Sequence, residues 1–247
     1  MQDKPVALVT GANKGIGLQI AKDLAARGFS VLVGSRNLEH GETAAKSVGA
    51  DARPLQLDVT NQASIAAAAE RIRNELGRLD VLVNNAAVSH AGKPGRTLEE
   101  IVKSGRASVA SLNEVRAVFE TNVFGVIAVT QAMLPLLREA PAGRIVNVSS
   151  AGGLLTINAD PTGQHRAAFG IYSSSKTALN AITLAFALEP TRIKVNAAAP
   201  GFTATDLNSF QGTRTVQQAA REPVRLALLD ENGPTGTFSN EDGPLPW

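Results

Sequence analysis

Short apolar segments alternate with longer amphipathic segments along most of the chain. The apolar runs predict buried strands at 5–10, 30–34, 53–57 and 80–83, and a period near 3.6 predicts helices between them. The first helix ends near Gly28, the second begins near Glu39, and the third covers about 61–76. A polar stretch, 89–111, interrupts this alternation. Beyond it the pattern predicts helices at 112–139, 171–188 and 213–229, and strands at 144–148, 193–198 and 237–238.

This order of elements predicts an α/β fold. Repeated strand-helix-strand units with right-handed crossovers build a doubly wound parallel sheet of the Rossmann type, with helices on both faces. We expect one dinucleotide-binding and catalytic domain over residues 1–247, with its ligand crevice at the carboxyl ends of the strands. Aromatic residues make up only 4% of the chain and hydrophobic residues 44%, so Ala, Val, Leu and Ile must form the core. That composition suits buried parallel strands.

Charge and composition exclude several classes of function. The formal net charge is +2 and the cations are scattered without a basic run, which argues against a nucleic-acid partner. We expect no apolar run of membrane-spanning length, and the amino-terminal segment lacks the pattern of a signal peptide, so we expect a cytoplasmic protein without a membrane partner. There is no cysteine, and His40, His90 and His165 lie far apart, so no metal site is predicted.

The only tyrosine, Tyr172, precedes Lys176 by four residues, and a helix would place both side chains on one face. A phenol has a reference pKa of about 10, so proton transfer near neutral pH needs stabilisation of the phenolate. An ammonium about 4 Å away supplies roughly 4 kcal/mol at an effective dielectric near 20. The pair therefore predicts a proton-transfer site. The alternative is an ordinary half-buried aromatic beside a solvated lysine.

A glycine-rich turn follows the first predicted strand and reads Thr10-Gly11-Ala12-Asn13-Lys14-Gly15-Ile16-Gly17. Glycine permits a tight turn and close approach of backbone amides to a diphosphate, and the following helix adds unsatisfied N–H donors. The turn could instead merely connect a strand to a helix. Its place after the first strand favours phosphate binding.

Several motifs occur together in a fixed order. They are the turn 10–17, Asn84-Asn85-Ala86-Ala87, Asn122, Ser149-Ser150, Tyr172 with Lys176, and Pro200-Gly201. On these residues the chain resembles the short-chain dehydrogenase/reductase family from about Pro5 to its carboxyl terminus, and its length before Asn122 and its final residues resemble the carbonyl-reductase-like branch. Two features depart from the family pattern: Ala87 stands where glycine is usual, and Ser150 and Tyr172 are 22 positions apart, which implies a modest insertion beside the site.

The resemblance implies an oxidoreductase that transfers a hydride reversibly between NADPH and a carbonyl carbon. Ser150 and Tyr172 would donate hydrogen bonds to the carbonyl oxygen, and Tyr172 would supply the proton. Lys176 would assist the phenol and bind the nicotinamide ribose, and Asn122 would hold a water that links Lys176 to solvent. Each residue also has a structural alternative, such as a strand-closing serine or an asparagine bonded within its helix.

The end of the second predicted strand indicates which cofactor is used. It reads Ser35-Arg36-Asn37 and carries no carboxylate to repel a phosphate, while Arg36 and Lys14 are cations suited to bind one. We therefore expect NADPH or NADP, although both residues could be solvated surface cations.

The resemblance also implies the remaining cofactor contacts. Asp58 and Val59 would contact the adenine, and the segment Asn84 to Ala86 would lie along the adenosine side. Phe202 and Thr203 would lie close to the carboxamide, and Thr205 near the phosphates. The expected cofactor-binding set is Gly11, Asn13, Lys14, Gly15, Ile16, Gly17, Arg36, Asp58, Val59, Asn84, Ala86, Tyr172, Lys176, Pro200, Gly201, Phe202, Thr203 and Thr205. Asp58 could instead be a turn carboxylate, Asn84 could secure the strand end, and Pro200-Gly201 could be a plain turn.

The regions 89–111, 151–170 and 202–214 are expected to shape the substrate opening. Leu154, Leu155, Ile157 and Phe202 suggest an apolar or mixed carbonyl substrate.

The family resemblance implies a homodimer or homotetramer built on the helices that begin near Leu112 and Ile171. Three alternatives stay open: an alcohol-oxidising dehydrogenase, a catalytically silent NADP-binding regulator, and a sugar-nucleotide epimerase or dehydratase, which we would expect to have a longer carboxyl-terminal region.

Overall fold

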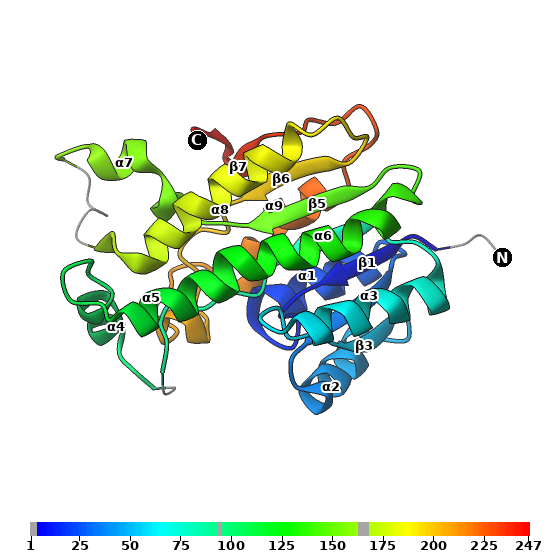
Figure 1. Cartoon of the computed structure of the whole chain (residues 1–247), viewed down its shortest axis with the longest axis horizontal. Helices are drawn as coiled ribbons and strands as arrows, with labels where there is room; N and C mark the ends of the chain where they lie inside the picture. Colours follow the sequence, from blue (N-terminus) through cyan, green and yellow to red (C-terminus); the bar gives the residue numbers. More distant parts are fainter. Residues whose placement is uncertain (1–3, 93–94, 163–167) are drawn as a thin grey trace.

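A computed structural model describes residues 4–92, 95–162 and 168–247. Within these ranges eight strands form one sheet in the order β3-β2-β1-β4-β5-β6-β7-β8 (Figure 1). The strands are β1 Val6–Val9, β2 Ser30–Ser35, β3 Ala52–Gln56, β4 Val81–Asn84, β5 Arg144–Val148, β6 Lys194–Ala198, β7 Phe238–Asn240 and β8 Gly243–Leu245. Neighbouring strands from β3 to β7 are parallel, and β8 pairs antiparallel with β7. The chain is therefore the expected single-domain α/β structure with a doubly wound sheet.

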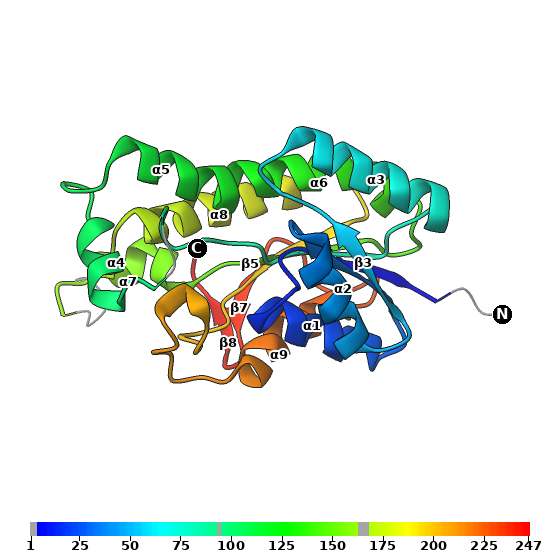
Figure 2. The same ribbon diagram turned by 90° about the horizontal axis from the view of Figure 1, so that it is seen from below.

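Helices cover both faces of the sheet (Figure 2). The face with α1 Gly15–Ala25, α2 Leu38–Val48 and α9 Val216–Ala227 lies opposite the face with α3 Gln62–Leu76, α5 Leu112–Phe119, α6 Gly125–Arg138 and α8 Ile171–Ala187. A π-helical segment, η1 Glu120–Phe124, joins α5 to α6. Shorter helices are α4 Leu98–Ser104, η2 Ala151–Gly153, α7 Leu155–Ala159 and η4 Asp206–Asn208.

The central strands are buried on both faces, which explains their continuous apolar runs. Successive residues of β1 alternate between two cores: Ala7 and Val9 pack with α1, α2 and α9, whereas Val6 and Leu8 pack with α3 and α6. Leu8 is in register with Leu82 of β4, so the same face continues across the sheet. This arrangement brings the carboxyl ends of β1, β4, β5 and β6 to one edge.

Several elements were not predicted, α4 and β8 among them. The polar stretch contains α4, whose amino terminus is fixed by a capping box between Thr97 and Glu100. The last strand was expected at 237–238, but the chain turns back at Asn240 and adds β8 as an antiparallel edge. A two-stranded hairpin this short carries too few alternating positions to be read from the pattern.

The expectation that no segment is long and apolar enough to span a membrane was wrong. Within the described residues the continuous helix Leu112–Arg138 meets both criteria, with a mean hydropathy of 1.4 in its most apolar window. A core helix of a soluble protein meets the same criteria, and 44% of that window is buried inside the fold. Val129, Met133 and Leu136 on this helix pack in the core against α3 and the sheet.

Candidate active site

The glycine-rich turn between β1 and α1 packs too closely on its surroundings to accept side chains. A Cβ at Gly17 would lie 2.4 Å from Asn85 Nδ2, and one at Gly11 would lie 2.9 Å from Ala86 Cα. Gly11 and Gly15 have φ values of 62° and 59°, which L-residues rarely adopt. The glycines are therefore required by the turn itself.

This turn fits a diphosphate. Helix α1 begins at Gly15, and its N-cap residue Lys14 does not cap the first-turn N–H groups with its side chain. These amides and the helix dipole form an anion-binding end. Asn13 is half-buried in the turn, and Ile16 packs against the core beneath it. The turn supplies backbone donors on a rigid base.

Tyr172 and Lys176 lie on one face of α8, as their spacing predicts. The Lys176 side chain is buried, and its Nζ donates a hydrogen bond of 2.8 Å to the carbonyl oxygen of Val148 at the end of β5. The same Nζ lies 5.8 Å from the centroid of the Tyr172 ring. The carbonyl fixes the ammonium beside the tyrosine.

Burial dominates the proton affinities of both groups. It raises the pKa of Tyr172 to about 12 and lowers the pKa of Lys176 to about 8. The expectation of a phenol pKa below the ordinary value was therefore wrong for this structure, because desolvation outweighs the effect of an ammonium that lies 5.8 Å from the ring centroid and is bound to a carbonyl. At neutral pH the phenol keeps its proton and the ammonium keeps its charge.

Asn122 lies in η1 and is fully buried. Its Oδ1 accepts from Val88 N at 2.9 Å, and its Nδ2 donates to Val88 O at 2.9 Å and to Ser175 Oγ at 3.0 Å. Ser175 Oγ in turn donates to Tyr172 O at 2.6 Å. The side chain of Asn122 thus ties the segment after β4 to the first turn of α8, and its amide group is directed at these partners rather than at Lys176.

Ser150 follows β5 and accepts a hydrogen bond from Gly152 N at 3.1 Å. The turn that it begins packs against α8: a Cβ at Gly153 would lie 2.8 Å from the backbone carbon of Lys176, and Thr177 Oγ1 donates to Gly153 O at 2.6 Å. The structure therefore brings Asn122, Ser150, Tyr172 and Lys176 to one place around the amino-terminal turns of α8.

The residues expected on the adenosine side have more varied surroundings. Arg36 is exposed immediately after β2, and its side chain pairs with no carboxylate among the described residues. Asp58 Oδ1 accepts from Thr60 N and Oγ1 at 2.9 and 2.7 Å, as a turn carboxylate does. Asn84 Nδ2 donates to Asn147 Oδ1 at 2.9 Å in a buried network. Val59 is buried, and a Cβ at Gly125 would lie 2.8 Å from its carbonyl oxygen.

The segment after β6 is held by its own hydrogen bonds. Gly201 has a φ of 76°, and a Cβ there would lie 2.5 Å from Cδ of Arg214. The buried hydroxyl of Thr203 donates to Gly201 O at 3.1 Å, whereas Phe202 is 47% exposed. Pro200 is half-buried at the strand end, and Thr205 Cγ2 lies 3.6 Å from the Cβ position of Gly15. This segment therefore reaches the glycine-rich turn.

The contacts that three residues make around the site were not predicted. Asn85 Nδ2 donates to Thr10 O at 2.9 Å and to Gly11 O at 3.2 Å, Ser175 links Asn122 to Tyr172, and Asp206 pairs with Lys14. Asn85 belongs to the Asn84-Asn85-Ala86-Ala87 motif, and Ser175 lies between Tyr172 and Lys176. Asp206 had no local signal, because its partner is remote in sequence.

Comparison with known proteins agrees with this geometry. The sequence profile described as short chain dehydrogenase matches residues 5–216. The chain belongs to the short-chain dehydrogenase/reductase family. It falls in the carbonyl-reductase-like branch of these oxidoreductases, which use a nicotinamide cofactor.

Individual relatives align over almost the whole chain. Short-chain dehydrogenase anuI from Penicillium roqueforti (strain FM164) is 39% identical over 95% of this chain and 92% of its own length. Carbonyl reductase 1 (NADPH) from Mus musculus is 33% identical over 99% of both chains. The structure of 3-ketoacyl-(acyl-carrier-protein) reductase from Brucella melitensis complexed with NADH superposes with a TM-score of 0.80, at 27% identity over 96% of each chain.

The low pKa of Lys176 predicts a pH-dependent stability. Because the folded pKa of about 8 lies below the ordinary 10.5, the unfolded chain binds more protons between these values. The stability that Lys176 contributes through this pKa difference is fully present above pH 10.5, and it is lost as the pH falls through about 8. We expect the free energy of unfolding of the wild type, relative to Lys176→Met, to rise by roughly 2–3 kcal/mol from pH 7 to pH 10 in urea titrations. An identical pH dependence in both proteins would contradict the assignment.

Proposed function

We propose that this protein is an NADPH-dependent carbonyl reductase that acts reversibly on ketones or aldehydes and the corresponding secondary alcohols. The observation that carries the proposal is the half-buried Tyr172 beside the buried Lys176 on α8, with Ser150 in the turn that packs against them. The nicotinamide cofactor, when bound, supplies or accepts the hydride. The protein's own task is to orient the carbonyl and to exchange the proton.

Tyr172 is the proton donor in this proposal. Its raised pKa keeps the phenol protonated at neutral pH, which is the form needed for carbonyl reduction. Negative charge that develops on the carbonyl oxygen is stabilised by hydrogen bonds from Tyr172 and Ser150 more strongly than the neutral carbonyl is. Lys176 provides a fixed positive charge near the phenol, which stabilises the phenolate left after proton transfer. The alcohol-oxidising direction would need that phenolate at the start.

Two surface cations support NADPH as the preferred cofactor. Arg36 stands directly after β2 without a carboxylate partner among the described residues, and Lys14 extends from the glycine-rich turn. A guanidinium and an ammonium at these positions suit the additional phosphate of NADP. The name of the mouse relative includes NADPH, whereas the structure of the Brucella melitensis reductase is a complex with NADH.

The proposed substrate is an apolar or mixed carbonyl compound. Leu155 is 57% exposed, Phe202 47% and Phe210 66%, so the segments beside the site present apolar side chains to solvent. The expectation for Leu154 was wrong, because it is fully buried in a core with Ala197 and Phe238, and Ile157 packs against the same cluster. Residues 93–94 and 163–167 of the expected substrate regions lie outside the described residues.

Tyr172→Phe tests the proton donor. This change removes one hydroxyl group and keeps the ring, so we expect kcat for carbonyl reduction to fall by about 10²-fold or more, because general acid catalysis is worth about that much. Cofactor affinity, measured by calorimetry, should change little. Assays that follow NADPH absorbance with aldehydes, aryl ketones, diketones, quinones and ketosteroids would also identify the substrate class. Near-wild-type reduction by the variant would refute this role.

Arg36→Asp tests the cofactor preference. The new carboxylate would repel the phosphate of NADPH and could accept hydrogen bonds from the ribose hydroxyls of NADH. We expect the ratio of kcat/KM for NADPH over NADH to fall by about tenfold or more, which is the effect of about 1.4 kcal/mol. Arg53→Asp, on a strand at the sheet edge, is the matched control. An unchanged ratio in Arg36→Asp would count against NADPH recognition by this residue.

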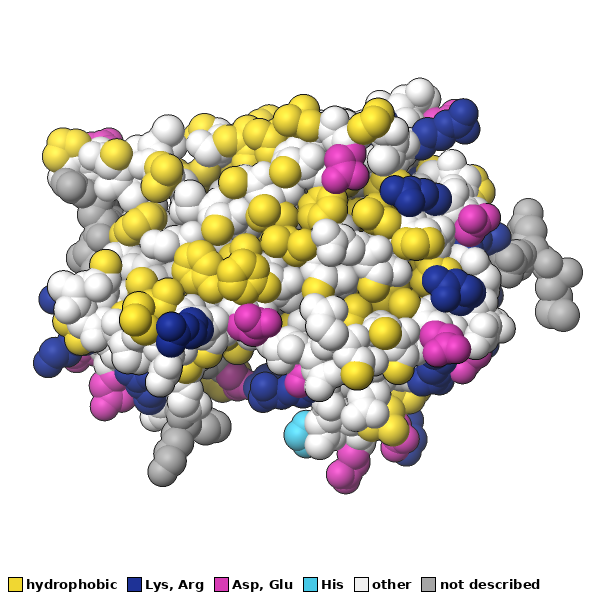
Figure 3. Space-filling model, in the orientation of Figure 1, with side chains coloured by type: hydrophobic (Ala, Val, Ile, Leu, Met, Phe, Trp, Pro, Cys, Tyr) yellow, Lys and Arg dark blue, Asp and Glu magenta, His cyan; other side chains and the backbone are white. Residues whose placement is uncertain are grey.

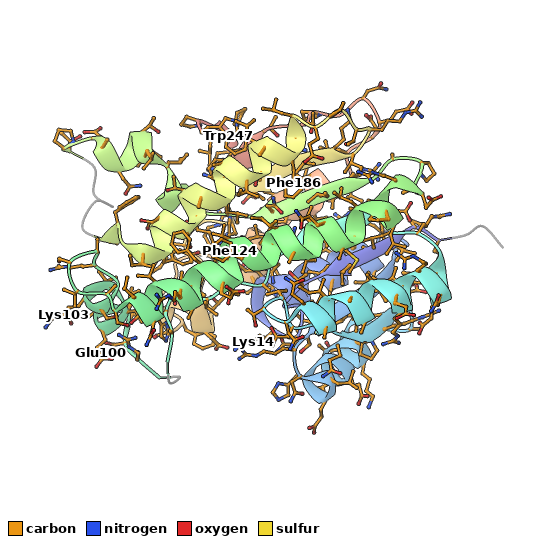
Figure 4. All side chains as sticks on the ribbon, in the orientation of Figure 1. Lys14, Glu100, Lys103, Phe124, Phe186 and Trp247 are labelled. Carbon is orange, nitrogen blue, oxygen red and sulfur yellow. The ribbon has the colours of Figure 1, made fainter. Side chains whose placement is uncertain are left out.

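We also propose a homodimer or homotetramer built on the faces of α5, α6 and α8. Phe124 is 53% exposed and Leu112 68% exposed on this long helix, and Leu188, just after α8, is 75% exposed. Figure 3 shows apolar side chains gathered along this face, and Figure 4 places Phe124 near its middle. Exposed apolar patches of this kind mark association surfaces.

Phe124→Asp tests this assembly. A carboxylate at the middle of the apolar face would have to be buried on association, so we expect a shift to monomer in light scattering at micromolar concentration. Leu38→Asp, an exposed apolar position on α2, is the control and should leave the assembly intact. A monomeric wild type, or an unchanged mass in Phe124→Asp, would exclude this interface.

A further inference from the structure

An ion pair joins the glycine-rich turn to the segment after β6. Lys14 Nζ contacts the carboxylate of Asp206, the first residue of η4. Figure 4 shows Lys14 at the border between the β1–α1 turn and this segment. The two residues are 192 positions apart, so the fold brings them together. Within the described residues Lys14 has no other side-chain partner.

Asp206 is not needed to hold its own segment. Ser89 Oγ donates to Leu207 O at 2.8 Å, and Ser209 Oγ donates to Arg96 O at 2.7 Å. Asn208 Nδ2 donates to Thr203 O at 2.9 Å inside the same segment. These bonds fix the segment from two sides without the ion pair. Loss of the Asp206 charge should therefore leave the backbone in place.

The segment is also rigid at its far end. Ser209 and Phe210 have φ values of 55° and 61°, an uncommon conformation for residues other than glycine. Phe210 N donates to Thr205 O at 2.9 Å, which closes this turn. A Cβ at Gly212 would lie 2.0 Å from the backbone carbon of Thr203. The conformation is thus determined by close backbone packing.

The ion pair itself is open to solvent, since the side chains of Lys14 and Asp206 are 66% and 46% exposed. Exposed ion pairs are weak and are screened by salt, so a stronger anion can displace the carboxylate. A phosphate group with about two negative charges is such an anion. Lys14 is one of the two cations proposed to bind the additional phosphate of NADP. In the ion pair, Asp206 neutralises the charge of Lys14.

We propose that Asp206 is a specificity-determining counter-ion that competes with the phosphate of NADP for Lys14. The carboxylate lowers affinity for the phosphorylated cofactor and thereby reduces discrimination between NADP and NAD. Because NAD lacks this phosphate, its binding does not require Lys14 to leave Asp206. This inference rests on the proposed use of NADP, and it concerns a residue that touches neither the phenol nor the reacting carbonyl.

Calorimetric titration of Asp206→Asn with NADP⁺ and NAD⁺ tests the proposal. We expect NADP⁺ to bind about threefold to fivefold more tightly than to the wild type, the range of an exposed ion pair, and NAD⁺ to change by less than about twofold. The gain should shrink at about 0.5 M NaCl. Asp206→Glu, which keeps the charge, should retain wild-type affinity, and Glu189→Gln, a remote exposed carboxylate, is the matched control.

The decisive test is whether the effect of Asp206→Asn on NADP⁺ affinity requires Lys14. Asp206→Asn should have no effect on NADP⁺ affinity in a Lys14→Met background, because the competed cation is gone. Equal tightening of NAD⁺ and NADP⁺, or weaker binding of both, would overturn the counter-ion role. If Lys14→Met and Arg36→Asp weaken NADP⁺ binding while Asp206→Asn changes nothing, only this inference fails. If neither cation matters, the proposed NADP recognition fails with it.

Discussion

The hydrogen bond from the buried ammonium of Lys176 to the Val148 carbonyl is the interaction on which the site depends. A buried charge without a partner is costly, so this carbonyl fixes where α8 meets the end of β5. Tyr172 is carried on the same helix face, four residues earlier. The position of the phenol relative to the sheet edge therefore follows from the packing of one charged side chain.

The same burial determines the chemistry. It raises the pKa of the phenol to about 12 and lowers the pKa of the ammonium to about 8, values at which the phenol carries its proton and Lys176 its charge at neutral pH, as the proposed reduction requires. Asn122 and Ser175 then brace the first turn of α8 against the segment after β4. The glycine-rich turn is equally constrained, because Gly17 packs against Asn85. The proposed proton donor and the glycine-rich turn thus both lie on elements that are held by close contacts.

The sequence was informative wherever the chemistry is local. The strand at 144–148 and the start of the helix at Ile171 were predicted at their observed positions, because apolar runs and the helical period are properties of single segments. The π-helical turn at Asn122, the short hairpin strand β8 and the Lys14–Asp206 pair were not predicted. Each depends on tertiary contacts. The direction of the Tyr172 pKa shift was also missed, since burial is a property of the folded chain.

The most direct test of this account is a measurement of the pKa of Tyr172. After a rapid jump to alkaline pH, the absorbance of tyrosinate reports how much of the phenol has ionised. The chain has one tyrosine, so the signal reports this residue alone. The account predicts a pKa of about 12 in the folded protein, above the ordinary 10.0. A midpoint at or below about 10 would contradict the claim that burial holds the proton on this phenol.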